Sequence, residues 1–154
     1  TLISSCPNIT YLGFSMIKLS AQFLNLIGCL RNLQFLSLYW IVDGSEEEMK
    51  TSIMKFAKIL PSSLHYLDLY DSSNIYADVF LDHCNAPLKK LLLKIDYKDK
   101  KAMDTLIRFC IRKKTLDNVY IHDLFNDVKL NELKNVLKDY VKLVTYYHQI
   151  VVDC

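Results

Sequence analysis

The chain has 154 residues, with 19 basic and 17 acidic side chains, and 51% of its residues are hydrophobic. This composition excludes a disordered or low-complexity chain, because enough apolar surface is available to offset the entropy lost on folding. The apolar runs are only a few residues long, so we expect no segment of about 18 apolar residues that would span a membrane.

Short β-strands are predicted wherever apolar residues follow one spacing: apolar, two residues, apolar, one residue, apolar. The pattern occurs at Ile9-x-x-Leu12-x-Phe14, Leu33-x-x-Leu36-x-Leu38, Leu64-x-x-Leu67-x-Leu69, Leu88-x-x-Leu91-x-Leu93, Leu116-x-x-Val119-x-Ile121 and, more weakly, Val141-x-x-Val144-x-Tyr146. We therefore predict strands near residues 10–15, 34–39, 65–70, 89–94, 117–122 and 142–147. The units are spaced 24, 31, 24, 28 and 25 residues apart. Their mean of about 26 lies within the range of about 20–29 residues that is typical of leucine-rich repeats.

The stretches between these strands have helical periodicity. Ser45 and Glu48 have the spacing of a capping box, and an apolar stripe from Met49 to Leu60 follows them. Two of the expected helices cover residues 20–29 and 73–84. Three others are expected to begin directly after caps at Ser45, Asp99 and Asp127. The repeating unit is therefore predicted to be strand, turn, helix, turn.

An α/β architecture follows from this unit, because one strand and one helix cannot bury their apolar faces alone. Stacked side by side, about six units would form a parallel sheet with helices behind it. We predict a single solenoid over residues 1–154, with a curved sheet on the concave face and helices on the convex face. We also expect the chain to be part of a longer array.

The first unit reads Cys6-Pro7-Asn8-Ile9-Thr10-Tyr11-Leu12-Gly13-Phe14. It resembles the cysteine-containing repeats of the leucine-rich-repeat family, in the form found in F-box proteins, and the irregular units are similar to those of fungal F-box-like proteins. The resemblance implies a solenoid that selects substrates for a ubiquitin ligase. The F-box itself, which would bind the ligase adaptor, does not occur within these 154 residues.

The side chains between the motif positions should line the inner face of the sheet, because side chains alternate along a strand. Tyr and Trp are enriched at binding hot spots, although aromatic residues also favour strands for packing reasons. The predicted partner-binding residues are Tyr11, Phe35, Tyr39, Trp40, Tyr66, Tyr70, Lys90, Lys94, Tyr120, His122 and Tyr147.

Positive charge is concentrated in residues 89–114, which carry a net charge of +7, whereas residues 1–88 carry −3. One interpretation is that these cations lie on solvated helix faces and caps. The other is that Lys90, Lys94 and His122 bind an acidic or phosphorylated peptide beside Tyr70 and Tyr120. No nucleic-acid partner or membrane partner is expected.

The cysteines and histidines form no recognisable catalytic or metal-binding motif. The five cysteines lack a CxxC pair, and their odd number, without a visible secretory signal, predicts reduced thiols in the cytoplasm or nucleus. No glycine-rich phosphate loop, GxSxG or HExxH occurs. We therefore expect no cofactor and no enzymatic activity.

The sequence leaves three functions open. The first is recognition of a protein or peptide by the concave face, within an F-box-type receptor. The second is regulation of another enzyme, as in leucine-rich-repeat activators of small GTPases. The third is a sensor array of an innate-immunity-type receptor.

Overall fold

The structure is a computed structural model that describes residues 8–69, 76–122 and 127–146. Strands and helices alternate along the chain. The strands are β1 (Tyr11–Ile17), β2 (Phe35–Trp40), β3 (Tyr66–Asp68), β4 (Lys90–Leu93), β5 (Asn118–His122) and β6 (Lys142–Tyr146). The helices are α2 (Ala21–Cys29), α3 (Glu46–Ile59), α4 (Ala77–His83), α5 (Lys100–Arg112) and α6 (Asp127–Leu137). The predicted α/β class and alternation are confirmed.

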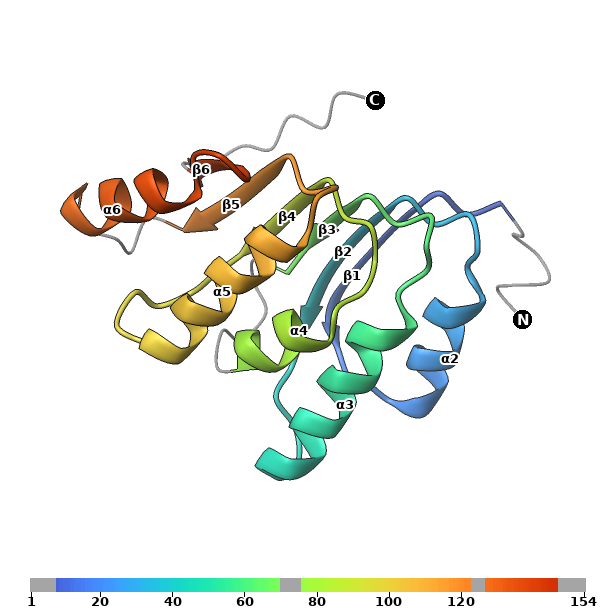
Figure 1. Ribbon diagram of the computed structural model, residues 1–154. Helices are drawn as coiled ribbons and strands as arrows, with labels where there is room; N and C mark the ends of the chain where they lie inside the picture. Colours follow the sequence, from blue (N-terminus) through green and yellow to red (C-terminus); the bar gives the residue numbers. More distant parts are fainter. Residues whose placement is uncertain (1–7, 70–75, 123–126, 147–154) are drawn as a thin grey trace.

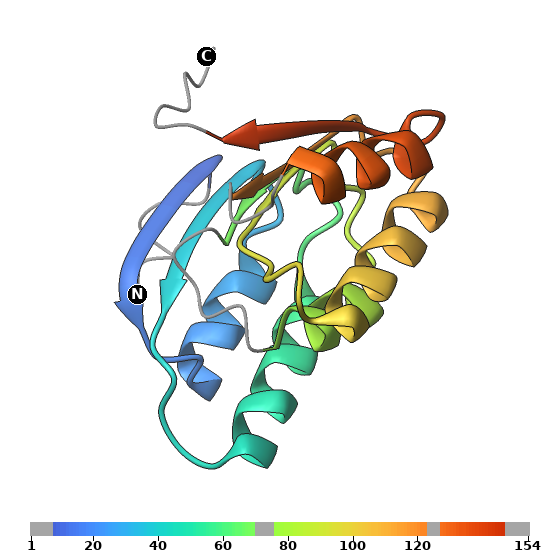
Figure 2. The same cartoon turned by 90° about the vertical axis from the view of Figure 1, so that its left-hand side faces the viewer.

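The six strands form one parallel sheet in the order β1-β2-β3-β4-β5-β6 (Figure 1). Connections between parallel neighbours are right-handed almost without exception, so strands added in chain order place every connecting helix on the same face. Figure 2 shows this arrangement, with α2 to α6 on one side of the sheet and the strand direction turning steadily from β1 to β6. No helix of the described residues covers the other face, which we call the open face.

Side-chain caps begin three of the helices, and two of these caps, at Ser45 and Asp99, are those that the sequence predicts. The Ser45 hydroxyl oxygen accepts a hydrogen bond from the Glu48 backbone N–H at 3.3 Å, and the Glu48 carboxylate accepts one from the Ser45 N–H at 2.8 Å. Asp99 accepts from the Ala102 N–H at 3.0 Å, and Ser20 caps α2 in the same way. These contacts satisfy N–H groups that have no partner within the helix. Asp127 differs from the prediction, because it is the first residue of α6 and not the residue before it.

The predicted core forms between the sheet and the helices. The middle motif residues of the first five units share one register row, which Leu143 of β6 completes: Leu12, Leu36, Leu67, Leu91, Val119 and Leu143. From β2 to β5 the members of this row are completely buried. The helices contribute Phe56, Phe80 and Phe109, each no more than 1% exposed. Burying large aromatic and aliphatic side chains is the main favourable contribution to folding.

The register of β6 corrects the sequence-based assignment. Val144 was predicted to point into the core, yet it pairs with Tyr120 on the open-face row, and Leu143 pairs with Val119. The sixth unit is thus shifted by one residue, and a shift of one residue exchanges the two faces of a strand. Val141 is nevertheless buried in the turn that follows α6, which explains why it matched the apolar pattern.

Candidate functional site

Two rows of side chains cross the open face of the sheet, as the strand pairings define them. The first row is Tyr11, Phe35, Tyr66, Lys90, Asn118 and Lys142. The second row is Gly13, Ser37, Asp68, Leu92, Tyr120 and Val144. Both rows change in chemistry between β3 and β4. The first row changes from aromatic to basic and amide side chains, and the second changes from Gly, Ser and Asp to Leu, Tyr and Val. The open face therefore has two chemically different halves.

An aromatic ladder occupies the first row over β1, β2 and β3. The ring centroids of Tyr11 and Phe35 are 6.4 Å apart, and those of Phe35 and Tyr66 are 5.6 Å apart. Aromatic rings at such separations attract each other beyond the effect of buried area. Tyr11 is 60% exposed at the end of the ladder, whereas Tyr66 is only 8% exposed. The ladder thus fixes a large aromatic surface in place with its outermost ring open to contact.

A hollow of about 280 Å³ lies beside the ladder. It is lined by Tyr11, Gly13, Phe14, Ser15, Ser37, Leu38, Tyr39 and Asp68. Gly13 helps to keep it open, since a strand glycine leaves room for close approach to the backbone. On the neighbouring strands, the Ser37 hydroxyl donates a hydrogen bond to the Asp68 carboxylate at 3.1 Å. The hollow therefore combines aromatic walls with polar groups that can orient a ligand.

The rim of the hollow is shaped by a β-bulge in β1. The register of β1 with β2 shifts between Phe14 and Ile17, so Ser15 and Met16 stand opposite Tyr39 alone. Met16 has φ +56°, a left-handed conformation that costs a residue with a side chain about 1–2 kcal/mol. Its side chain is 68% exposed. Bulges re-aim side chains and are common next to binding sites.

The predicted partner-binding residues are only partly brought together. Tyr11 and Tyr39 line the hollow, and Phe35 and Tyr66 form the ladder beside them. Lys90, Lys94 and Tyr120 lie on the other half of the open face or at its edge, separated from the hollow by β3. Tyr70, Tyr147 and the side chain of His122 lie outside the described residues.

Trp40 was wrongly placed on the binding face. Its side chain is 4% exposed and packs edge-on against Phe56 of α3, with ring centroids 5.8 Å apart. Residues alternate along β2, so the position after exposed Tyr39 faces the helices. Trp40 is therefore a core residue and is not accessible to a partner.

Sequence reasoning missed several residues of the open face. Gly13, Ser15, Ser37 and Asp68 were not selected, although a glycine inside a strand motif is a recognised sign of close approach. Lys142 was missed because the sixth unit was read one residue out of register. The structure adds it to the row that contains Lys90.

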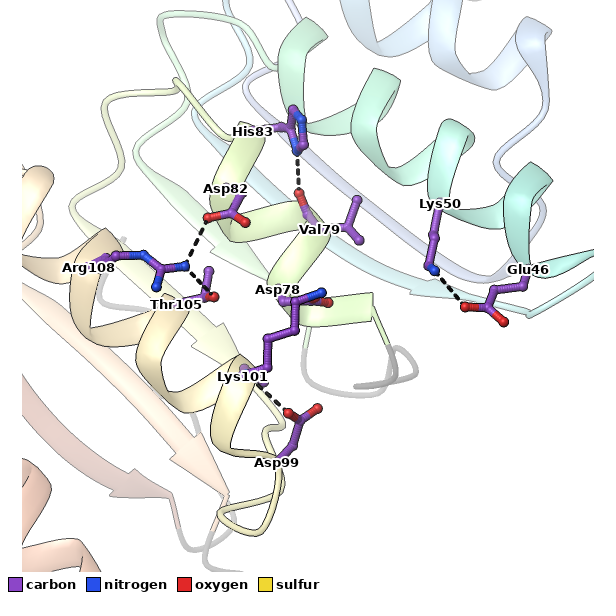
Figure 3. A network of polar contacts seen from close by, with 11 residues as sticks. Glu46, Lys50, Asp78, Val79, Asp82, His83, Asp99, Lys101, Thr105 and Arg108 are labelled. Atoms are coloured by element: carbon purple, nitrogen blue, oxygen red, sulfur yellow. Dashed lines mark hydrogen bonds and ion pairs between the residues drawn. The ribbon is translucent and has the colours of Figure 1, made fainter.

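Much of the basic segment 89–114 serves packing between α4 and α5. Arg108 contacts Asp82 at 3.6 Å, and Lys101 contacts Asp78 at 2.6 Å (Figure 3). At the other end of α5, Arg112 donates to the Leu81 carbonyl. These contacts fit the structural interpretation of the charge. Lys90 and Lys94 are different, because neither forms an ion pair with any side chain in the described ranges.

His83 and the buried thiols of Cys84 and Cys110 are held within the packing of α4 and α5. His83 Nδ1 lies 2.9 Å from the Val79 carbonyl of its own helix. Burial raises the pKa of the adjacent Cys84 thiol to about 11 and that of Cys110 to about 12, so both thiols are protonated at neutral pH. Within the same residues, no group of three or more His, Cys, Asp or Glu side chains is placed to hold a metal ion. No described helix is long and apolar enough to cross a bilayer.

Comparison with known proteins found no match among protein-family models, curated proteins or solved structures. The functional argument therefore depends on the open face itself. Its strongest features are the aromatic ladder that ends at exposed Tyr11, the adjoining hollow and the change from aromatic to basic side chains at β4.

Proposed function

We propose that this chain is a leucine-rich-repeat type of array whose open face recognises a protein or peptide without catalysing a reaction. The observation that carries the proposal is the aromatic ladder ending at exposed Tyr11 beside the hollow over β1 to β3. Tyr side chains offer a large contact area at low entropic cost, and such residues dominate binding energies at interfaces.

A recurring backbone contact supports the repeat interpretation. At the first residue of each strand from β2 to β6, the N–H donates to the carbonyl that immediately precedes the neighbouring strand. The pairs are Phe35 to Thr10, Tyr66 to Gln34, Lys90 to His65, Asn118 to Lys89 and Lys142 to Asp117, all between 2.9 and 3.0 Å. Each unit is thus joined to the one before it in the same way, as stacked repeats require.

The proposed biological role is substrate selection in an F-box-type ubiquitin-ligase receptor. It is supported by the resemblance of the segment Cys6 to Phe14 to F-box repeats and by the exposed binding surface. Contact with the ligase adaptor would require an F-box outside these 154 residues. The isolated chain is therefore expected to bind the selected peptide or protein and not the adaptor.

Selection from a random 12-residue peptide library displayed on phage would test the proposed function. Peptides that bind the chain should lose at least about tenfold in affinity for the double variant Tyr11→Ala/Tyr39→Ala, since each truncation removes an exposed aromatic contact. The matched control is Tyr140→Ala, because Tyr140 is 50% exposed but lies between α6 and β6.

Fluorescence polarisation would measure the affinities, and circular dichroism would establish that all variants are folded. Peptides that bind the double variant as tightly as the unchanged chain would contradict the proposed function. A library that yields no binder would also count against it.

A further inference from the structure

The basic half of the first row places three hydrogen-bond donors on consecutive strands. Lys90 of β4 pairs with Asn118 of β5, which pairs with Lys142 of β6. Neighbouring strands are about 4.8 Å apart, so the two lysine backbones are about 10 Å apart with Asn118 between them. Long, flexible lysine side chains can converge over the shorter amide from both sides.

The two lysines are available to a ligand. Both are exposed, and neither forms an ion pair or side-chain hydrogen bond within the described residues. The contrast with Arg112 and Lys113 is clear, because those cations donate to carbonyl oxygens of Leu81 and Ala86. The first row therefore carries two positive charges that have no ion-pair partner among the described residues.

The chemistry of the three side chains defines the ligand. Two ammonium groups and one amide NH₂ are all donors, and the group that accepts from several donors while neutralising positive charge is an oxyanion. We propose that Lys90, Asn118 and Lys142 bind a carboxylate or phosphate of the same peptide whose apolar part contacts the aromatic ladder. The inference rests on the proposed function and specifies the partner of that site.

The geometry also fixes the direction and spacing of the peptide. The ladder and the donor triad belong to the same row, so the peptide must run across the strands and not along one of them. Phe35 and Asn118 are separated by three strand spacings, about 14 Å. An extended chain covers this distance in about four residues. The partner should therefore carry an aromatic or aliphatic residue with an acidic or phosphorylated residue about four positions away.

Inorganic phosphate tests the oxyanion site without any peptide. We would titrate the ¹⁵N-labelled chain with phosphate at constant ionic strength and follow its amide signals by NMR. The Asn118 side-chain amide and the backbone amides of Lys90 and Lys142 should shift saturably. The shifts should vanish in the double variant Lys90→Gln/Lys142→Gln. They should persist in the charge-matched control Lys55→Gln/Lys58→Gln on the exposed surface of α3.

Peptides selected on the unchanged chain test the link between the two halves. Each peptide would be compared in three versions, with Glu, phosphoserine or Ser at the acidic position. Lys90→Gln/Lys142→Gln should weaken the Glu or phosphoserine version about tenfold in low salt, less in high salt, and leave the Ser version unchanged. The difference between the first two versions tells whether the natural oxyanion is carboxylate or phosphate.

The outcomes separate the two claims. If binding depends on Tyr11 and Tyr39 but not on Lys90 and Lys142, the oxyanion site is overturned and the proposed function stands. If phosphate shifts do not saturate, or survive in the lysine double variant, the oxyanion site is overturned irrespective of the peptides. If phosphate binds but no peptide depends on the aromatic residues, both the proposed function and the peptide partner inferred here are overturned.

Discussion

The indole of Trp40 meets the ring of Phe56 edge-on, with centroids 5.8 Å apart and planes at 67°. This contact joins β2 to α3 in the middle of the core. Replacing Trp40 with Ala should lower the free energy of unfolding by about 3–5 kcal/mol, because it removes a large buried aromatic side chain and leaves a cavity. Urea denaturation monitored by circular dichroism would measure the loss.

Tyr39 provides the control for Trp40, since it is the preceding residue of the same strand but faces the open side. Tyr39→Ala should change stability by less than about 1 kcal/mol, because Tyr39 is 37% exposed and lies outside the core between the sheet and the helices. Equal destabilisation by the two variants would contradict the assignment of Trp40 to the core and Tyr39 to the binding face.

The fold followed from the sequence where local patterns and packing agree. The spacing of Leu33, Leu36 and Leu38 predicted both the strand and its buried face, because alternation in a strand leaves only one face for apolar residues. The Ser45 and Glu48 pair predicted the start of α3 because a capping box acts over four residues. Local signals of this kind do not depend on distant parts of the chain.

The site was less predictable because it depends on register between strands. The apolar pattern at Val141 and Val144 misassigned the faces of β6, since the short turn after α6 buries Val141 without placing it in the sheet. The bulge at Met16 has no sequence signal, as methionine rarely adopts positive φ. Both features decide which side chains meet on the open face, and both appear only when neighbouring strands are aligned.

The capping box of α3 should make stability depend on pH. Hydrogen bonds from the backbone N–H and the hydroxyl of Ser45 hold the pKa of Glu48 below its ordinary value of 4.5. A carboxyl with a depressed folded pKa contributes stability above its unfolded pKa, and this is lost as the pH falls through the folded pKa. Thermal unfolding from pH 6 down to pH 3 should therefore show a steeper loss of stability for the unchanged chain than for Glu48→Gln.

Ser45→Ala is the companion variant, and it should cost about 0.5–2 kcal/mol at neutral pH, the usual effect of losing an N-cap. Glu47→Gln serves as the control, because the neighbouring carboxylate takes no part in the capping box. Identical pH profiles for the unchanged chain and Glu48→Gln would show that the capping box does not couple protonation to folding.

The cysteines should differ sharply in reactivity. Cys29 is exposed, whereas Cys84 and Cys110 are buried with pKa values raised by burial to about 11 and about 12. The thiolate is the reactive form, so iodoacetamide at pH 8 should label Cys29 in the folded chain and reach the other two only after unfolding. Peptide mass spectrometry would measure labelling at each site. Rapid native labelling of Cys84 would contradict the packing described for α4.

Arg112 should stabilise the packing of α4 on α5. Its Nη2 donates to the Leu81 carbonyl at 2.9 Å, and its guanidinium lies 5.7 Å from the centre of the Phe109 ring. Arg112→Met keeps much of the apolar contact but removes the donor. Hydrogen bonds from charged groups typically contribute about 1.5–3 kcal/mol, so a loss of about this size is expected in urea denaturation.

The control for this prediction is Lys114→Met, which removes the same charge two residues later from an exposed side chain. Surface substitutions of this kind change stability by about 0.5 kcal/mol or less. If the two variants are destabilised equally, the Arg112 contact contributes only through net charge. A larger loss for Arg112→Met, unaffected by high salt, would locate the effect in the hydrogen bond to Leu81, because long-range charge effects are screened by salt.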